Sequence, residues 1–367
     1  MSYQNITFAK NTRVTKKYLS KVMSDARRKY QVPAISVSMM NSEKMLLQEI
    51  QGTRVIDKKE LATLDDYFHI GSCSKSVLAL MAEKFVEQKK IRWQTKFFDV
   101  YPELKDKARK SYFDITLEDL FLCEAGILPF TSGEEKFPEI ALSESHSRLE
   151  FIKYLTRQKP ASKYTNYKFQ HLYSNASYTM ASAMLEKVAG ENYESLVKKT
   201  LVDDMGLSVH IGWPNSFEVD QPWGHLVTKK NIEALPPEHE YKLPYLLTPA
   251  GDLSLSSRDY AKYTQFHLQG LRGENNHITS KGYKYIHFSH DGFSLGVANG
   301  VLNGNRFSAF DGSAGFFFCR SIIVPEANFA MTIMMNAGSG SGTMKAVDWL
   351  TMKIVNKHFN WWWRFWL

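Results

Sequence analysis

FHIGSCSKSVLALMAEKFVEQKKI, residues 68–91, is the stretch from which the rest of the sequence is best understood. Its apolar residues recur at three- and four-residue spacing from Val77 to Phe85, which is typical of one face of a helix. Serines at the start of this pattern carry hydroxyls that can cap the free N–H groups of a first turn. The stretch therefore predicts a buried helix over residues 72–88 that begins at a capped turn.

Ser72 and Lys75 lie three positions apart at the start of this predicted helix, so both side chains fall on one helix face. A serine hydroxyl becomes a good nucleophile when a neighbouring base takes its proton, and a lysine can be that base when burial lowers its pKa. A helix start also offers backbone N–H groups where an oxyanion develops. The same spacing recurs at Ser195 and Lys198, so the surrounding sequence has to decide.

Strand patterns occur at both ends of the chain, and helical patterns dominate the middle. A helix is expected over residues 15–30, and a β-hairpin follows it. The predicted strands are 34–40, 44–50, 293–301, 308–324 and 329–336, and the helices of the middle and the end are 116–123, 147–158, 176–189, 192–201, 257–269 and 343–358. We therefore expect an α/β (α+β) fold in which residues 1–89 and 286–367 form one sheet domain and residues 90–285 an inserted, mainly helical domain.

The length and composition agree with a large folded core. The chain has 367 residues, 44% of them hydrophobic and 23% charged, which is sufficient for two modules and excludes a disordered or fibrous protein. The net charge is +8, but the basic residues are dispersed in pairs such as Lys89-Lys90. A nucleic-acid partner needs a concentrated basic stripe, so we expect none.

Cysteines and histidines do not form a metal-binding pattern. Cys73, Cys123 and Cys319 lack the paired spacing of a zinc site and are expected to be free thiols. Cys73 would point about 100 degrees away from the neighbouring serine on a helix, so we expect a small buried residue there. His287 and His290 lack a further ligand nearby. We predict no metal and no other cofactor.

Neither a membrane-spanning helix nor a secretory signal is expected in the chain as given, because no apolar run approaches 18 residues and the start MSYQNITFAKNTRV lacks an apolar region. This favours a cytoplasmic location, or a periplasmic one if a signal peptide was removed. The terminal WWWRFWL, residues 361–367, favours packing or contact within a homo-oligomer over attachment to a membrane surface.

Five further segments give residues 68–91 their context. They are FDVYPE (98–103), ITLEDLFLCEAGILPF (115–130), HLYSNASYTMASAMLEKVAG (171–190), PAGDLSLSSRDYAKY (249–263) and FDGSAGFFF (310–318). In this order the chain resembles the serine β-lactamase, penicillin-binding protein and class C esterase superfamily over about residues 30–358. The first stretch matches Phe-x-Ile-Gly-Ser-x-x-Lys, Tyr173 to Asn175 match Tyr-x-Asn, and residues 310–318 stand in place of the Lys-Thr-Gly or His-x-Gly strand.

The resemblance implies an antiparallel sheet flanked by helices, with an all-helical domain inserted. It implies that Ser72 is acylated, that Lys75 holds or accepts its proton, and that Tyr173 moves protons to the leaving group and activates the hydrolytic water. Asn175 would bind the acyl side chain and orient the lysine. The backbone N–H groups of Ser72 and Ser313 would form the oxyanion hole.

The third motif departs from the family pattern. Phe310 stands where relatives place Lys or His, and a phenyl ring can neither donate a proton nor carry charge. Asp311 and Gly312 follow it, and we expect both to contact substrate, with the carboxylate disfavouring acidic substrates. A second Tyr-x-Asn pattern, Tyr164 to Asn166, lacks the following helix.

These features leave three hypotheses for the function. The first is a serine hydrolase acting on a small-molecule ester, amide or β-lactam, with esters and neutral amides favoured over penicillins. The second is a slow or inactive penicillin-binding or sensor protein of the same fold. The third is a D-alanyl-D-alanine peptidase.

Overall fold

The computed structural model describes residues 12–132, 135–138, 147–217, 220–228, 231–239, 241–338 and 340–359. Its centre is a six-stranded antiparallel sheet in the order β10-β11-β12-β13-β1-β2. The strands are β1 (Ala34–Met40), β2 (Met45–Gly52), β10 (Ala298–Leu302), β11 (Asn305–Ser313), β12 (Phe318–Val324) and β13 (Phe329–Met335). Because β1 pairs with β13, the two ends of the chain meet in one sheet, and the predicted hairpin is β1–β2.

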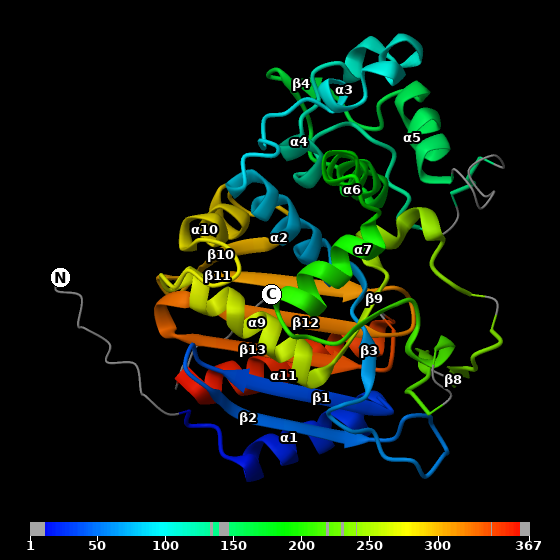
Figure 1. Cartoon of the computed structure of the whole chain (residues 1–367). Coiled ribbons are helices and arrows are strands. Elements are labelled where there is room, and N and C mark those ends of the chain that lie inside the picture. The colour runs from blue at the N-terminus through cyan, green and yellow to red at the C-terminus, as the bar shows by residue number, and fades with distance from the viewer. Residues whose placement is uncertain are drawn as a thin grey trace.

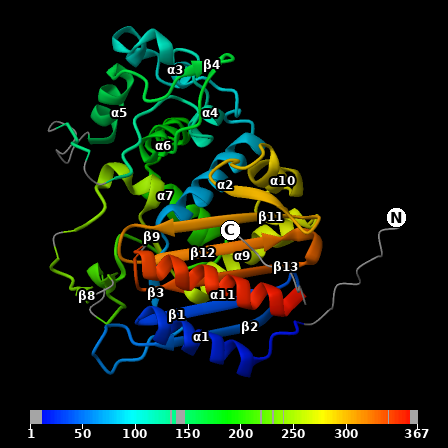
Figure 2. The ribbon, with the colours of Figure 1, turned by 180° about the vertical axis from the view of Figure 1, so that it is seen from behind.

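Helices cover both faces of this sheet. The helices α1 (Lys16–Tyr30) and α11 (Ser341–Phe359) pack together on one face, and α9 (Ser257–Leu271) packs on the other (Figures 1 and 2). Residues of β1, β12 and β13 are accordingly buried throughout, which explains their nearly continuous apolar sequences. The expected antiparallel sheet with flanking helices is confirmed.

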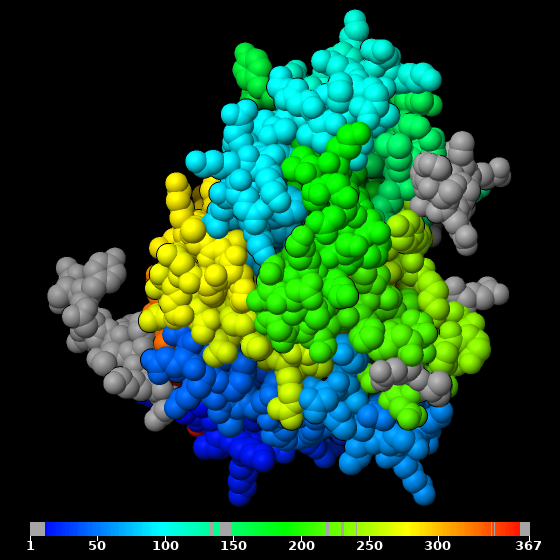
Figure 3. All heavy atoms as spheres, viewed as in Figure 1, coloured from blue at the N-terminus to red at the C-terminus, as the bar shows by residue number. Residues whose placement is uncertain are grey.

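The helical part of the chain lies above the sheet in Figure 1, and the space-filling view of the same face shows its cyan atoms at the top, with green atoms below them beside the yellow ones (Figure 3). The predicted helix over residues 72–88 is α2 (Ser74–Glu87), which is buried from Ser74 to Glu83. The other helices are α3 (Phe97–Val100), α4 (Leu117–Phe121), α5 (Ser147–Arg157), α6 (Asn175–Ala189), α7 (Tyr193–Val197), α8 (Thr248–Gly251) and α10 (Ser280–Phe288). The short strands are β3 (Tyr67–His69), β4 (Tyr164–Thr165), β5 (Lys168–Phe169), β6 (Val209–Ile211), β7 (Gly224–Val227), β8 (Ile232–Leu235) and β9 (Leu253–Ser256).

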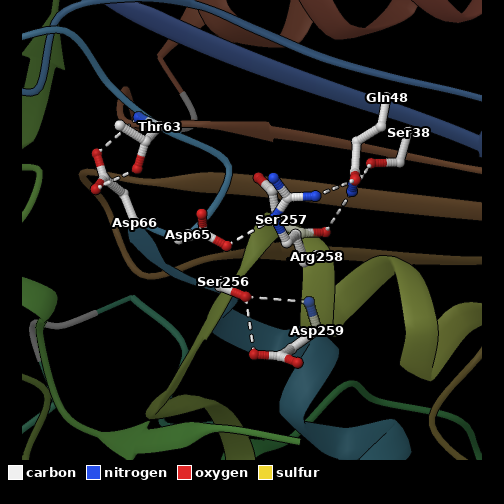
Figure 4. A network of polar contacts seen from close by, with 9 residues as sticks. All are labelled: Ser38, Gln48, Thr63, Asp65, Asp66, Ser256, Ser257, Arg258 and Asp259. Atoms are coloured by element: carbon white, nitrogen blue, oxygen red, sulfur yellow. Dashed lines mark hydrogen bonds and ion pairs between the residues drawn. The ribbon is translucent and has the colours of Figure 1, made fainter.

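The N-terminus of α9 is tied to both β2 and the loop before β3 (Figure 4). Ser256 caps the helix, because its Oγ accepts the Asp259 N–H at 3.0 Å and donates to the Asp259 carboxylate at 2.8 Å. Arg258 pairs with Asp65 at 2.7 Å, and the Gln48 side chain donates to the Ser257 carbonyl at 3.4 Å. α9 therefore belongs structurally with the sheet although it lies within residues 90–285, and the domain limits given above stay predictions.

The serines at the start of α2 do not cap it, so that expectation was wrong. A 3₁₀ turn, η1 (Gly71–Cys73), runs directly into the helix, and Cys73 already has helical backbone angles. The Ser74 hydroxyl donates backward to the Gly71 carbonyl at 2.8 Å, and the Ser76 hydroxyl to the Cys73 carbonyl at 2.7 Å. A capping side chain needs an extended backbone at its own position, which this continuous turn does not provide.

No helix in the described part of the chain is long and apolar enough to cross a membrane. The terminal WWWRFWL lies outside the described residues, so the expectations for it stay predictions.

Candidate active site

The nucleophile candidate Ser72 sits in the turn η1, which is pressed against the end of β11. Gly71 has a positive φ of 52°, and a Cβ atom there would lie 2.4 Å from the Ser313 nitrogen. A Cβ atom on Gly312 would lie 1.9 Å from the Ile70 carbonyl oxygen and 2.9 Å from the Ser72 nitrogen. Only glycine fits at these two positions. The contact brings the turn with Ser72 close to the backbone of Ser313, and the resemblance assigns the N–H groups of these two serines to the oxyanion hole.

The side chain of Lys75 contacts the Ser72 hydroxyl. This side chain is fully buried, and its Nζ lies 3.2 Å from Ser72 Oγ, 2.7 Å from Asn175 Oδ1 and 2.7 Å from the Ala250 carbonyl oxygen. Burial lowers the pKa of Lys75 to about 7, because a charged amine loses its hydration there. A large fraction of this lysine is therefore neutral at neutral pH.

The hydrogen bonds around Lys75 determine where its lone pair points. The Asn175 side-chain nitrogen donates to the Phe130 carbonyl at 2.9 Å, which turns Oδ1 of the same amide toward the lysine. A neutral amine has two N–H donors and one lone pair. Asn175 Oδ1 and the Ala250 carbonyl can only accept, so they take both donors. The lone pair then faces Ser72 Oγ and can accept the hydroxyl proton.

Tyr173 completes the group of side chains at the nucleophile. It directly precedes the N-cap Ser174, whose hydroxyl accepts the Ser177 N–H and opens α6. Burial raises the pKa of Tyr173, while a hydrogen bond with Ser72 acts in the opposite direction. The Lys75 Nζ lies 4.8 Å from the centre of its ring. Tyr173 is thus a neutral phenol that can donate a proton.

A cavity of about 570 Å³ opens at Ser72. Asn175, Ala250, Gly251 and Ser313 border it near the nucleophile. The described residues that line the rest are Phe130, Thr131, Ser132, Glu135, Phe137, Tyr241, Lys242, Leu243, Pro244, Leu247, Ala314 and Gly315. This lining mixes apolar and aromatic side chains with polar ones, and its charged members are Glu135 and Lys242. Loops carry most of these residues without any motif, so the sequence analysis missed them.

Asp311 does not line this cavity, and the expectation that it contacts substrate was wrong. Successive residues of a strand point to opposite faces, and Asp311 lies directly opposite Arg320 of β12 on the face covered by α11. Its two carboxylate oxygens accept from Arg320 at 2.7 and 2.6 Å, and the same guanidinium pairs with Asp348 of α11. The carboxylate is therefore held by a structural ion-pair network away from Ser72.

Phe310 is a core residue. It is 3% exposed, and its ring centre lies 5.9 Å from that of His267 and 5.5 Å from that of His287. The two imidazoles share a 2.8 Å hydrogen bond, and His287 contacts the Ser308 hydroxyl at 2.6 Å. Burial lowers the pKa of both histidines, for His287 to about 3. Burial keeps both imidazoles neutral. His267 and His287 therefore do not supply the positive charge that a Lys or His of the third motif would provide.

The other residues considered for catalysis or metal binding do not join the group around Ser72. Tyr164 and Asn166 are exposed on the β4–β5 hairpin, and Ser195 is exposed on α7. The Cys73 thiol is buried and lies 3.7 Å from the Cys319 carbonyl oxygen. Among the described residues there is no group of three or more His, Cys, Asp or Glu side chains that could hold a metal ion.

Several solved structures share this fold. The octameric penicillin-binding protein homologue from Pyrococcus abyssi superposes with a TM-score of 0.72 at 19% identity, over 95% of this chain and 79% of that one. The beta-lactamase from Sulfitobacter sp. EE-36 gives 0.74 at 15% identity, over 94% and 98%. FmtA from Staphylococcus aureus gives 0.72 at 15% identity, over 95% and 92%. These likenesses establish the fold.

The search of curated proteins found no match. The family model described as Beta-lactamase matches residues 19–355, from α1 through most of α11. This range contains all six strands of the sheet and the whole group around Ser72. The chain therefore belongs to the beta-lactamase family.

Proposed function

We propose that the protein is a serine hydrolase that cleaves an ester or a neutral amide through an acyl-Ser72 intermediate. The single observation that carries the proposal is the buried Lys75, whose Nζ lies 3.2 Å from Ser72 Oγ and whose pKa is lowered to about 7. A lysine base is effective when its pKa lies near the working pH. Membership of the beta-lactamase family supports a serine-hydrolase type of function.

Acylation follows from the contacts of these groups. Neutral Lys75 accepts the hydroxyl proton as Ser72 Oγ bonds to the carbonyl carbon. The oxygen that becomes negative accepts hydrogen bonds from the backbone N–H groups of Ser72 and Ser313, each worth about 3 kcal/mol in similar sites. As the bond to the leaving alkoxide or amine breaks, Tyr173 donates its proton to that group, and the Lys75 ammonium returns a proton to Tyr173.

Deacylation uses the same groups in reverse. Water attacks the acyl carbon and gives a proton to Tyr173, which passes a proton on to Lys75. Ser72 Oγ then leaves and takes a proton from the lysine ammonium. Each group ends in the protonation state in which it began, and the products are the free acid and the alcohol or amine.

The cavity favours substrates with an apolar acyl group. Phe130, Phe137, Leu243 and Leu247 supply aromatic and aliphatic surface in the cavity that opens at Ser72. Phe310 removes the third-motif cation that would meet a substrate carboxylate. We therefore expect esters and neutral amides to be turned over faster than penicillins.

The test is hydrolysis of p-nitrophenyl esters with acyl chains of two to eight carbons. We expect wild-type turnover above background, Ser72→Ala at background, and the rate rising with chain length as apolar surface is buried. Ser195→Ala is the matched control and should behave like wild type, because Ser195 on α7 and Lys198 directly after α7 are both exposed. Equal rates for wild type and Ser72→Ala would contradict the proposal.

The second candidate is a slow penicillin-binding protein. Ser72, Lys75 and Tyr173 would still allow acylation by a β-lactam, whereas Phe310 leaves the third motif without the cation that would bind a β-lactam carboxylate. A fluorescent penicillin separates the two functions. A label on Ser72 that persists for hours, with no ester turnover, identifies a binder, whereas rapid ester turnover with little penicillin label identifies the hydrolase.

The proposed partners are small-molecule esters, amides or β-lactams. A homo-oligomer is a further expectation, in line with the octameric assembly of the homologue from Pyrococcus abyssi. Analytical ultracentrifugation of the full chain would test it, and a sedimentation coefficient of a monomer at all concentrations would exclude it.

A further inference from the structure

We propose that a buried His69–Asp252 pair positions the nucleophile turn, so that both residues act on catalysis through the backbone of Gly71. His69 is the last residue of β3 and is 0% exposed, and Asp252 directly precedes β9 and is 7% exposed. His69 Nε2 lies 3.0 Å from Asp252 Oδ1. The other ring nitrogen, Nδ1, accepts the Gly71 N–H at 3.2 Å.

These two contacts fix the tautomer of the imidazole. An N–H group can only donate, so Nδ1 of His69 carries no proton and accepts from Gly71. The proton of the neutral ring then lies on Nε2 and is donated to the Asp252 carboxylate. Removing that acceptor would allow the proton to move to Nδ1, where it would face the Gly71 N–H. The carboxylate thereby keeps His69 in the form that can bind the turn.

Packing holds the ring in this orientation. The Trp213 ring stacks on His69 with centroids 4.5 Å apart and planes 19° from parallel. Next to the pair, the Ile70 N–H donates to the Leu253 carbonyl at 2.8 Å, and the Leu253 N–H donates to the Ser74 hydroxyl at 3.3 Å. The pair therefore joins the turn to β9 at a point where little movement is possible.

Asp252 is also a departure from the sequence pattern of the superfamily. Residues 249–263, PAGDLSLSSRDYAKY, resemble its Ala-Gly-Gly-Leu segment, and Asp252 stands at the second glycine of that pattern. A buried carboxylate needs a donor to offset the loss of hydration. His69 supplies this donor, so the two residues form a matched pair.

The turn is sensitive to this support because Gly71 is in the left-handed region, with φ of 52°, and a Cβ atom there would lie 2.4 Å from the Ser313 nitrogen. A rotation at Gly71 would move the Ser72 hydroxyl and the Ser72 N–H together. A misplacement of about 1 Å in a reacting group costs about 100-fold in rate. We therefore expect Asp252→Ala and His69→Leu to lower kcat of ester hydrolysis by about ten- to 100-fold while KM changes less than about twofold.

Conservative variants separate positioning from mere structural support. His69→Asn keeps an acceptor near the position of Nδ1, and Asp252→Asn keeps an acceptor for the Nε2–H. The kcat of each should therefore be about tenfold higher than that of the apolar variant at the same position, His69→Leu or Asp252→Ala. Asp65→Ala, which removes an exposed carboxylate paired with Arg258, is the matched control and should leave kcat unchanged. Folded variants with wild-type kcat, or equal losses for Asn and Ala at position 252, would overturn the proposal.

The kinetic test rests on the proposed function, whereas the tautomer does not. ¹⁵N NMR of histidine-labelled protein should show His69 with Nε2 protonated and Nδ1 unprotonated, in wild type and in Ser72→Ala. An Nδ1-protonated ring would overturn the positioning role even if ester turnover is normal. The predicted tautomer together with absent turnover would instead count against the hydrolase.

Discussion

The burial of Lys75 predicts a pH-dependent cost to stability that can be measured without any substrate. Lysine normally titrates at 10.5, and burial lowers the pKa of Lys75 to about 7. Between these two values the unfolded chain binds more protons than the folded one, so the free energy of unfolding rises with pH. Below the folded pKa the full cost of burying the charge is present, and above the unfolded pKa it is absent.

The magnitude follows from the shift. One pKa unit corresponds to about 1.4 kcal/mol, so the whole shift amounts to about 5 kcal/mol. Of this, about 3 kcal/mol falls between about pH 6 and about pH 9, a range in which unfolding can be followed in urea. Lys75→Met has no charge to bury. The free energy of unfolding of wild type minus that of Lys75→Met should therefore increase by about 3 kcal/mol over this range.

The assay is urea unfolding of wild type, Lys75→Met and Lys198→Met, followed by tryptophan fluorescence at several pH values. Lys198 is exposed on the surface, so its variant should run parallel to wild type. A difference between wild type and Lys75→Met that stays flat from about pH 6 to about pH 9 would refute the reasoning, because Lys75 would then have to be charged in the folded protein.

Three further predictions concern activity and the third motif. The kcat/KM for ester hydrolysis should rise with pH through a midpoint of about 7 as Lys75 loses its proton and then stay level, since burial raises the pKa of Tyr173; a profile that falls through this range would contradict Lys75 as the base. Tyr173→Phe should lower kcat on the order of 10² to 10⁴, whereas Tyr164→Phe, on an exposed hairpin, should leave it unchanged. Phe310→Lys should lower the free energy of unfolding in urea, because it buries a cation beside two histidines that burial keeps neutral. A variant that gains penicillin hydrolysis and keeps the stability of wild type would contradict the assignment of Phe310 to the core.

Local sequence patterns predicted most of the regular structure. Helical spacing located α2 and α6 within about two residues, and apolar runs located the β1–β2 hairpin and β13. The predicted strand over residues 293–301 starts too early, because Gly296 within it has a positive φ of 83° and β10 begins only at Ala298. The helix α10 was not predicted at all.

The group around Ser72 could be predicted because each member lies in a short motif. Ser72 and Lys75 share a helix turn, and Tyr173 and Asn175 flank an N-cap. The direction of the Asp311 side chain could not be predicted in the same way. Its outward direction depends on the register of β11 with β12, and its partner is fixed only when the strands pair.

Other features depend on contacts between distant segments. Phe310 meets His267 and His287 only after α9, α10 and β11 have packed together. His69 and Asp252 are 183 residues apart and meet through the pairing of β3 with β9. A histidine before the Gly-Ser of the nucleophile turn, and an aspartate in place of a glycine, were the available signals in the sequence.

The account depends on Ser72 being the group that is acylated. The most direct measurement is mass spectrometry of the protein after reaction with a fluorophosphonate, followed by mapping of the modified peptide. We predict one adduct on the peptide that carries Ser72, its absence in Ser72→Ala, and its retention in Ser195→Ala. An adduct on another residue, or none in the folded wild-type protein, would contradict the account.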